Sequence, residues 1–126
     1  MAEKQRAHPG EKERAHPRVT ASIHVNVTVA TGAGRSVRAE KIANISLGGV
    51  FIEMPEPLGF GTEVSLEFKL TQERAPVRCK GFVMWSTKGK AEVPEGRKGI
   101  GVRLTDLSVA DMKELSEFID ERLRRG

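Results

Sequence analysis

The chain has 126 residues, of which 38% are hydrophobic and 30% charged, and its 21 basic and 17 acidic side chains give a net charge of +4. This balance fits one globular domain with its own core and excludes an acidic disordered activator. The single cysteine, Cys79, excludes an intramolecular disulfide and a cysteine-based zinc cluster.

The first eighteen residues differ in composition from the rest of the chain. They contain no Val, Ile, Leu, Phe or Trp. Such a segment cannot bury enough apolar surface to offset its ordering entropy, so we predict a flexible arm over 1–18 and a folded domain over 19–126. The chain also lacks a secretory signal and any apolar run of the roughly 18 residues that span a bilayer. We therefore expect a cytoplasmic protein without membrane insertion.

Beyond the arm, apolar and polar residues alternate with period two in short segments separated by Gly-rich or Pro-rich stretches. This alternation is typical of half-buried strands. The predicted strands cover 19–29, 36–43, 50–53, 64–70, 77–85 and 100–104, with a turn over 44–49 and loops over 55–61 and 88–98. Six short strands joined by turns favour an antiparallel β-barrel, because closure removes exposed edges.

The period changes to that of a helix over about 108–124. Ser108 and Asp111 resemble a capping box at its start. An apolar stripe then follows, which we expect to pack against the core. The stripe consists of Met112, Leu115, Phe118, Ile119 and Leu123.

Patterns that support catalysis are absent from the sequence. Cys79 shares a strand face with Val77 and Val83, so we interpret it as a small buried hydrophobic residue. There is no nucleophile elbow, phosphate loop or paired histidine motif. The sequence therefore predicts neither an enzyme nor a metal or cofactor site.

Two local patterns carry binding chemistry. Arg14 and Arg18 form an Arg-x-x-x-Arg pair, and guanidinium groups bind phosphate, pair with guanine and stack on flat bases. The second is Asn44-Ile-Ser46-Leu-Gly-Gly49, in which Asn can bond a base edge, Ser can bond phosphate and Gly lets a ligand approach the backbone. The alternative for the arginine pair is a chance spacing, since the chain has a second such pair in Arg74 and Arg78, which we interpret as solvated charge. The alternative for the second pattern is an Asx-type turn with a glycine bulge.

These features, in this order, resemble the PilZ domain family. The segment 80–85, Lys-Gly-Phe-Val-Met-Trp, looks like the family's Gly-x-Val-x-Trp strand. The segment 99–104, Gly-Ile-Gly-Val-Arg-Leu, looks like its Gly-Ile-Gly-Val-x-Phe strand, with Leu104 replacing the aromatic residue. The resemblance extends from Arg14 to Leu123.

The resemblance implies a six-stranded β-barrel that binds cyclic di-GMP, a bacterial second messenger. Carried over to this chain, Arg14 and Arg18 would hold guanine and phosphate from the arm. Asn44 would read a guanine edge, Ser46 would support the ligand and Gly49 would make room for it. The arm would become ordered over the ligand, and that change of shape would be the signal.

One position departs from the family pattern. Many members have a further arginine where this chain has Glu13. A carboxylate near ligand phosphates is repulsive, so Glu13 is expected to weaken binding or to favour one bound ligand over a stacked pair. A protonated His16 would offset part of this repulsion.

The resulting hypothesis is a cyclic di-GMP receptor that acts on a downstream protein partner in motility or surface behaviour. One alternative is a PilZ-like protein-interaction module that binds no nucleotide. Another is a basic binder of single-stranded nucleic acid, which is disfavoured because stacking aromatic residues are few.

Overall fold

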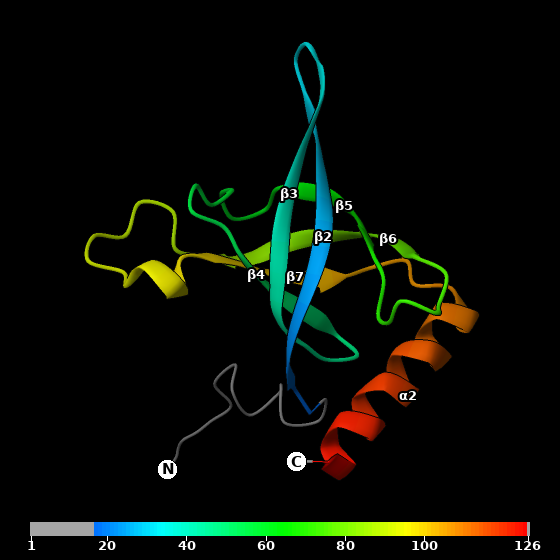
Figure 1. Cartoon of the computed structure of the whole chain (residues 1–126). Coiled ribbons are helices and arrows are strands. Elements are labelled where there is room, and N and C mark those ends of the chain that lie inside the picture. Colours follow the sequence, from blue (N-terminus) through cyan, green and yellow to red (C-terminus); the bar gives the residue numbers. More distant parts are fainter. Residues whose placement is uncertain (1–16, 126) are drawn as a thin grey trace, which may run out of the picture.

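The structure of the protein is a computed structural model that describes residues 17–125. Its elements are β2 (Val19–Thr31), β3 (Gly34–Ile45), β4 (Gly49–Glu53), β5 (Glu63–Phe68), β6 (Val77–Ser86), the 3₁₀ turn η1 (Glu95–Arg97), β7 (Gly99–Leu104) and α2 (Val109–Arg125) (Figure 1). The strands close into an antiparallel barrel in the order β2-β3-β4-β7-β6-β5. The predicted six-stranded barrel with a C-terminal helix is confirmed.

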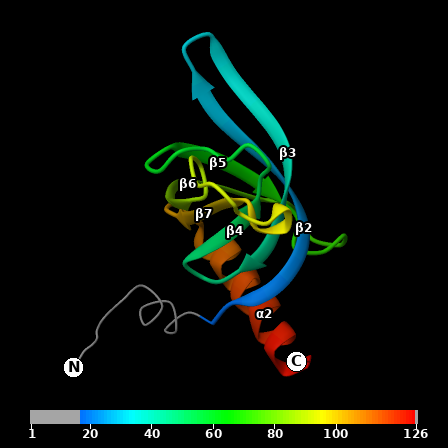
Figure 2. The same cartoon turned by 90° about the vertical axis from the view of Figure 1, so that its left-hand side faces the viewer.

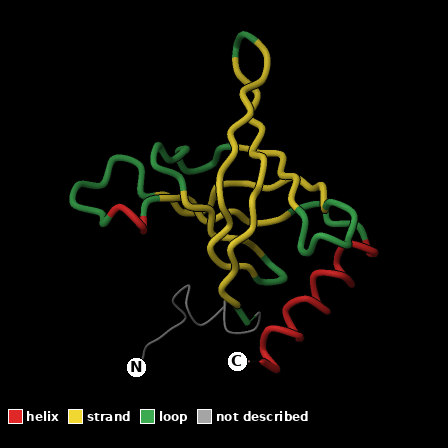
Figure 3. The backbone as a smooth tube through the Cα atoms, viewed as in Figure 1, coloured by secondary structure: helices red, strands yellow, loops and turns green. Residues whose placement is uncertain are grey.

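The barrel interior is filled by the apolar positions of the alternating strands. In β2, for example, Ile23, Val25 and Val27 are buried, whereas His24 and Asn26 between them are exposed. The helix α2 lies beside one end of the barrel (Figures 2 and 3). It adds Leu115, Phe118 and Ile119 to the same core. Burial of these side chains supplies the main favourable free energy of folding.

The helix begins where the capping pattern predicts. The backbone N–H of Asp111 donates to the Ser108 hydroxyl oxygen at 3.0 Å, which satisfies an amide of the first turn. The predicted apolar stripe is wrong at both ends, because Met112 and Leu123 are 46% and 45% exposed. Only the middle of α2 packs against the barrel. Within residues 17–125, no helix has the length and apolar character needed to cross a membrane.

Several strand boundaries also differ from the prediction. The strands β2 and β3 each extend two residues further toward their shared turn, to Thr31 and from Gly34. The strand β3 continues through Asn44 and Ile45, which were expected in a turn. The strand β5 ends at Phe68, although Leu70 beyond it is still buried. The predicted flexible arm lies outside the described residues, apart from Pro17 and Arg18.

The hairpin of β2 and β3 is much longer than the rest of the barrel and projects beyond it (Figure 1). The two strands pair with each other from their barrel ends to Thr31 and Gly34. The barrel partners cover only part of this length, since β5 pairs with residues 25–28 of β2 and β4 with residues 41–45 of β3. The tip of the hairpin is therefore a two-stranded ribbon.

Cys79 is 5% exposed in the barrel core, as expected from its strand position. Burial, together with the carboxylates of Asp106 and Asp111, raises the pKa of its thiol to about 12. At pH 8 only about one thiol in ten thousand would then be ionised, and the thiolate is the reactive form. We expect the native protein to react with an aromatic disulfide reagent at least about 100-fold more slowly than the urea-unfolded chain. Equal rates in the two states would contradict this assignment.

Candidate ligand-binding site

Arg18 and Asn44 are brought together at the start of the β2–β3 hairpin. Arg18 directly precedes β2, and Asn44 is the cross-strand partner of Thr20. The guanidinium Nη1 of Arg18 donates to the Asn44 side-chain oxygen at 3.0 Å. Arg18 is exposed and Asn44 is half-buried. The pair therefore presents a cation and an amide group together at the surface.

Ser46 is 4% exposed, and its hydroxyl is used within the turn between β3 and β4. The hydroxyl oxygen accepts from the backbone N–H groups of Gly48 and Gly49, both at 3.2 Å. The backbone N–H of Ser46 donates to the Gly49 carbonyl at 2.8 Å. Ser46 thus fixes the shape of the turn that follows Asn44, which is a positioning role.

Gly49 lies where β4 and β7 approach closely. A Cβ atom at this position would lie 2.5 Å from the carbonyl oxygen of Val102. The neighbouring Gly48 carbonyl accepts from the Leu104 N–H at 3.1 Å. The missing side chain is therefore required by strand packing, whether or not a ligand is present.

Two β-bulges turn side chains outward at this face. Between Ile42 and Asn44, β3 holds one residue more than β4 opposite it. Asn44 therefore faces outward between the buried Ile42 and Ile45. The same irregularity between Val83 and Trp85 leaves the Trp85 side chain 48% exposed. Strict alternation from Val77 through Val83 would place Trp85 on the buried face, and the bulge reverses its direction.

The outward residues form one row across four neighbouring strands. Asn44 lies opposite Phe51, Phe51 opposite Gly101, and Gly101 opposite Trp85. Residues that lie opposite each other share a face, and three strand spacings amount to about 14 Å. The Phe51 and Trp85 rings lie side by side on this face, with centroids 5.9 Å apart and planes inclined by 50°. We call Asn44, Phe51, Gly101 and Trp85 the aromatic row.

Basic side chains border the aromatic row. The Lys90 ammonium group lies 5.2 Å from the centroid of the Trp85 ring, within the range of a cation–π contact. Arg103 is exposed on β7, opposite Gly49 and two residues from Gly101, so it faces the same side. With Arg18 beside Asn44, cations lie around a surface that offers flat rings and an amide.

Of the residues proposed from sequence, the structure brings together Arg18, Asn44, Ser46 and Gly49. Glu13, Arg14 and His16 lie outside the described residues. The sequence did not indicate that four further residues lie at this surface, namely Phe51, Trp85, Lys90 and Arg103. Trp85 is part of a recognisable strand motif, but its outward direction depends on a bulge that has no local sequence signal. Among residues 17–125, no group of three or more His, Cys, Asp or Glu side chains could hold a metal ion.

Comparison with known proteins assigns the chain to a family. The family model described as PilZ domain matches residues 12–121. The chain belongs to the PilZ domain family. A search of the curated proteins finds no match.

Among solved structures, two PilZ-like neighbours share the fold. One is the Bacillus subtilis inhibitor of motility MotI/DgrA, with a TM-score of 0.67 and 18% identity over 86% of this chain and 51% of the other. The chain thus spans about half the length of MotI. The second is the PilZ domain of YcgR from Escherichia coli, solved with c-di-GMP, with a TM-score of 0.60 and 15% identity over 87% of this chain and 91% of the other.

Proposed function

We propose that this PilZ domain is a receptor for cyclic di-GMP and that it acts on a protein partner in the control of motility or surface behaviour. The observation that carries the proposal is the hydrogen-bonded pair of Arg18 and Asn44 at one end of an outward-facing aromatic row. The family membership and the YcgR domain solved with c-di-GMP support the choice of ligand. The likeness to MotI, an inhibitor of motility, supports the link to motility.

The chemistry of the aromatic row fits this ligand. Cyclic di-GMP carries two phosphate charges and two flat guanine bases. Arginine pairs with guanine O6 and N7 or with phosphate, and an amide can bond the guanine edge. Stacking of a base on an aromatic ring contributes about 1–3 kcal/mol. Phe51 and Trp85 would stack with guanine, while Arg18, Lys90 and Arg103 would attract the phosphates.

The signal in this proposal is a change of shape in the segment that carries Arg14 and Arg18. Both arginines would close over the bound dinucleotide, with Glu13 and His16 adjusting its affinity. The protein partner would then bind the closed form better than the open form, which is sufficient to shift the equilibrium. Glycine at position 49 and the hydroxyl of Ser46 would hold the adjoining turn in shape.

Titration with cyclic di-GMP tests the proposal, and Trp85 is the chain's sole tryptophan and hence a built-in fluorophore. We expect a saturable change in its emission and a dissociation constant in the micromolar range or below. Ligand at about 100 times this constant should stabilise the domain by about 2.7 kcal/mol in thermal unfolding.

Cyclic di-AMP is the matched control, because it keeps both phosphates and replaces guanine by adenine. It should bind at least about 10-fold more weakly, since adenine offers a donor where guanine offers the O6 acceptor. Absence of cyclic di-GMP binding at about 100 μM would instead favour the alternative, a PilZ protein-interaction module that binds no nucleotide.

A further inference from the structure

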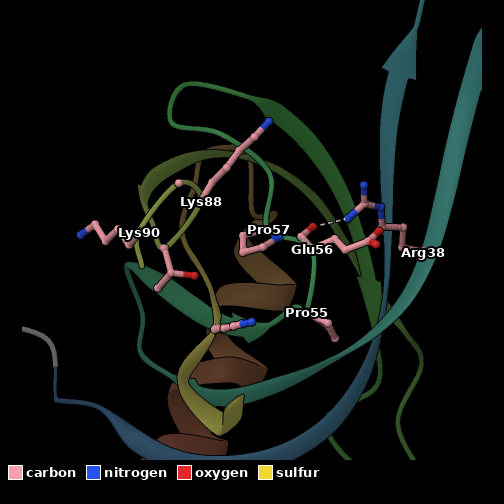
Figure 4. Close-up of a pocket in the computed structure, with 9 residues that line it drawn as sticks. Arg38, Pro55, Glu56, Pro57, Lys88 and Lys90 are labelled. Atoms are coloured by element: carbon pink, nitrogen blue, oxygen red, sulfur yellow. Dashed lines mark hydrogen bonds between the residues drawn. The ribbon is translucent and has the colours of Figure 1, made fainter. Parts of the chain in front are cut away.

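A pocket lies beyond the ends of β4 and β6, away from Arg18 and Asn44. It has a volume of about 370 Å³, at the lower end of the range typical of small-molecule sites. Its walls come from β3, the segment after β4 and the segment between β6 and β7 (Figure 4). We call it the basic pocket. Its lining residues are Arg38, Pro55, Glu56, Pro57, Thr87, Lys88, Gly89, Lys90 and Lys98.

The charge of the basic pocket is strongly one-sided. Four of its lining residues are cationic and Glu56 is the single carboxylate among them. Figure 4 shows Lys88 and Lys90 on one side of the pocket and Arg38 on the other, with Glu56 and Pro57 between them. Cations that surround one hollow from separate segments raise the local concentration of anions.

The turn that carries the lysines is held rigidly by hydrogen bonds. Thr87 is 5% exposed, and its hydroxyl oxygen accepts from the Gly99 N–H at 3.0 Å. The N–H of Lys90 donates to the Thr87 carbonyl at 3.0 Å, and that of Lys88 donates to the Ser86 hydroxyl oxygen at 3.0 Å. Because this turn is already ordered, a ligand would lose little free energy to backbone ordering when it binds, which favours binding.

The opposite wall is tied to β3. The Arg38 Nη1 donates to the backbone carbonyl of Glu56 at 2.6 Å. Pro55 and Pro57 flank Glu56 and restrict the backbone of this wall. The bond orients the Arg38 guanidinium at the pocket, and a guanidinium has five donors, so others remain for a phosphate group.

The basic pocket is separate from the Arg18–Asn44 pair. Arg38 lies six residues before Asn44 on β3, a distance of about 20 Å along the strand. Lys90 lies between the two places, because it both lines the pocket and covers the Trp85 ring. An anion that draws Lys90 into the pocket would therefore change the surroundings of Trp85.

We propose that the basic pocket is a second anion site, which lies apart from the Arg18–Asn44 pair and binds the diphosphate group of a small molecule. A diphosphate carries several negative charges close together. The four cationic residues that line the pocket complement these charges. The long lysine side chains can turn toward it from the rim, while the Arg38 guanidinium contacts it from the fixed wall. The diphosphate could be free or part of a nucleotide.

Titration of the full chain with pyrophosphate tests this proposal, followed by Trp85 fluorescence and backbone amide NMR shifts. We expect saturation in the submillimolar range, with shifted amides concentrated in residues 86–98. The double variant K88Q/K98Q should bind at least 10-fold more weakly. K113Q is the matched control, because Lys113 is an exposed lysine on α2, and it should bind as the wild type does.

The same titration with ADP separates the two sources of a diphosphate. Tighter binding of ADP than of pyrophosphate would support a nucleotide ligand, and equal binding would support a free diphosphate. The proposal is overturned if pyrophosphate does not saturate below about 10 mM or if K113Q loses as much affinity as K88Q/K98Q. It is also overturned if Arg18→Ala abolishes pyrophosphate binding, which would place the anion at the dinucleotide surface instead.

Discussion

Replacement of Arg18 by alanine is expected to raise the dissociation constant for cyclic di-GMP about 10- to 100-fold. The reason is the loss of charge-assisted hydrogen bonds, each of which contributes about 1.5–3 kcal/mol. Arg18 is exposed at the start of β2, so the same change should leave the free energy of unfolding of the ligand-free domain within about 0.5 kcal/mol of the wild type. Calorimetric titration and urea unfolding measure the two quantities.

Arg35→Ala provides the matched control for this substitution. Arg35 is also an exposed arginine, but it lies near the tip of the β2–β3 hairpin, opposite Ala30. It should bind cyclic di-GMP as the wild type does. If both variants lost affinity equally, binding would reflect net charge alone. Wild-type affinity in Arg18→Ala would show that this arginine has no part in the site.

Gly49→Ala is expected to destabilise the fold strongly. Its methyl group would lie 2.5 Å from the Val102 carbonyl, so β4 and β7 would have to move apart. Overpacking of this kind costs about 2–3 kcal/mol. For a domain of this size the loss corresponds to a decrease in melting temperature of about 10 °C. Thermal unfolding without ligand measures it.

Gly32→Ala is the comparison, because a Cβ atom at Gly32 would contact nothing within 4 Å. We expect its melting temperature to stay within about 2 °C of the wild type. If Gly49→Ala unfolded at the wild-type temperature, the close approach of β4 and β7 would not be what requires glycine there. The role of Gly49 would then have to be sought in ligand binding.

The strands and the helix of the barrel could be predicted well, because each is specified by a pattern of residues close together in the sequence. Alternation in a strand such as 19–29 shows directly which side chains point inward, and Ser108 marks the start of α2 through a contact three residues away. Such patterns depend on neighbouring residues alone. The six strands and the helix could therefore be recognised before their pairing was known.

The candidate site was predicted only in part, because its geometry depends on pairing between distant strands. The bulges beside Asn44 and Trp85 arise from mismatched lengths of paired strands, which no single segment reveals. Phe51 and Trp85 are neighbours only because β7 lies between β4 and β6 in the barrel. Strict alternation alone would therefore place Trp85 in the core, and it gives Phe51 no role in the site.

The projecting hairpin has a consequence for self-association. Over residues 34–40, β3 has no pairing partner beyond β2 among the residues that the structure describes. Unpaired strand edges are templates on which other chains can add strands, and natural proteins protect them with charge. Arg35, Arg38 and Glu40 lie along this edge. Their charges oppose the stacking of hairpins into cross-β aggregates and allow a long bare ribbon to exist at high concentration.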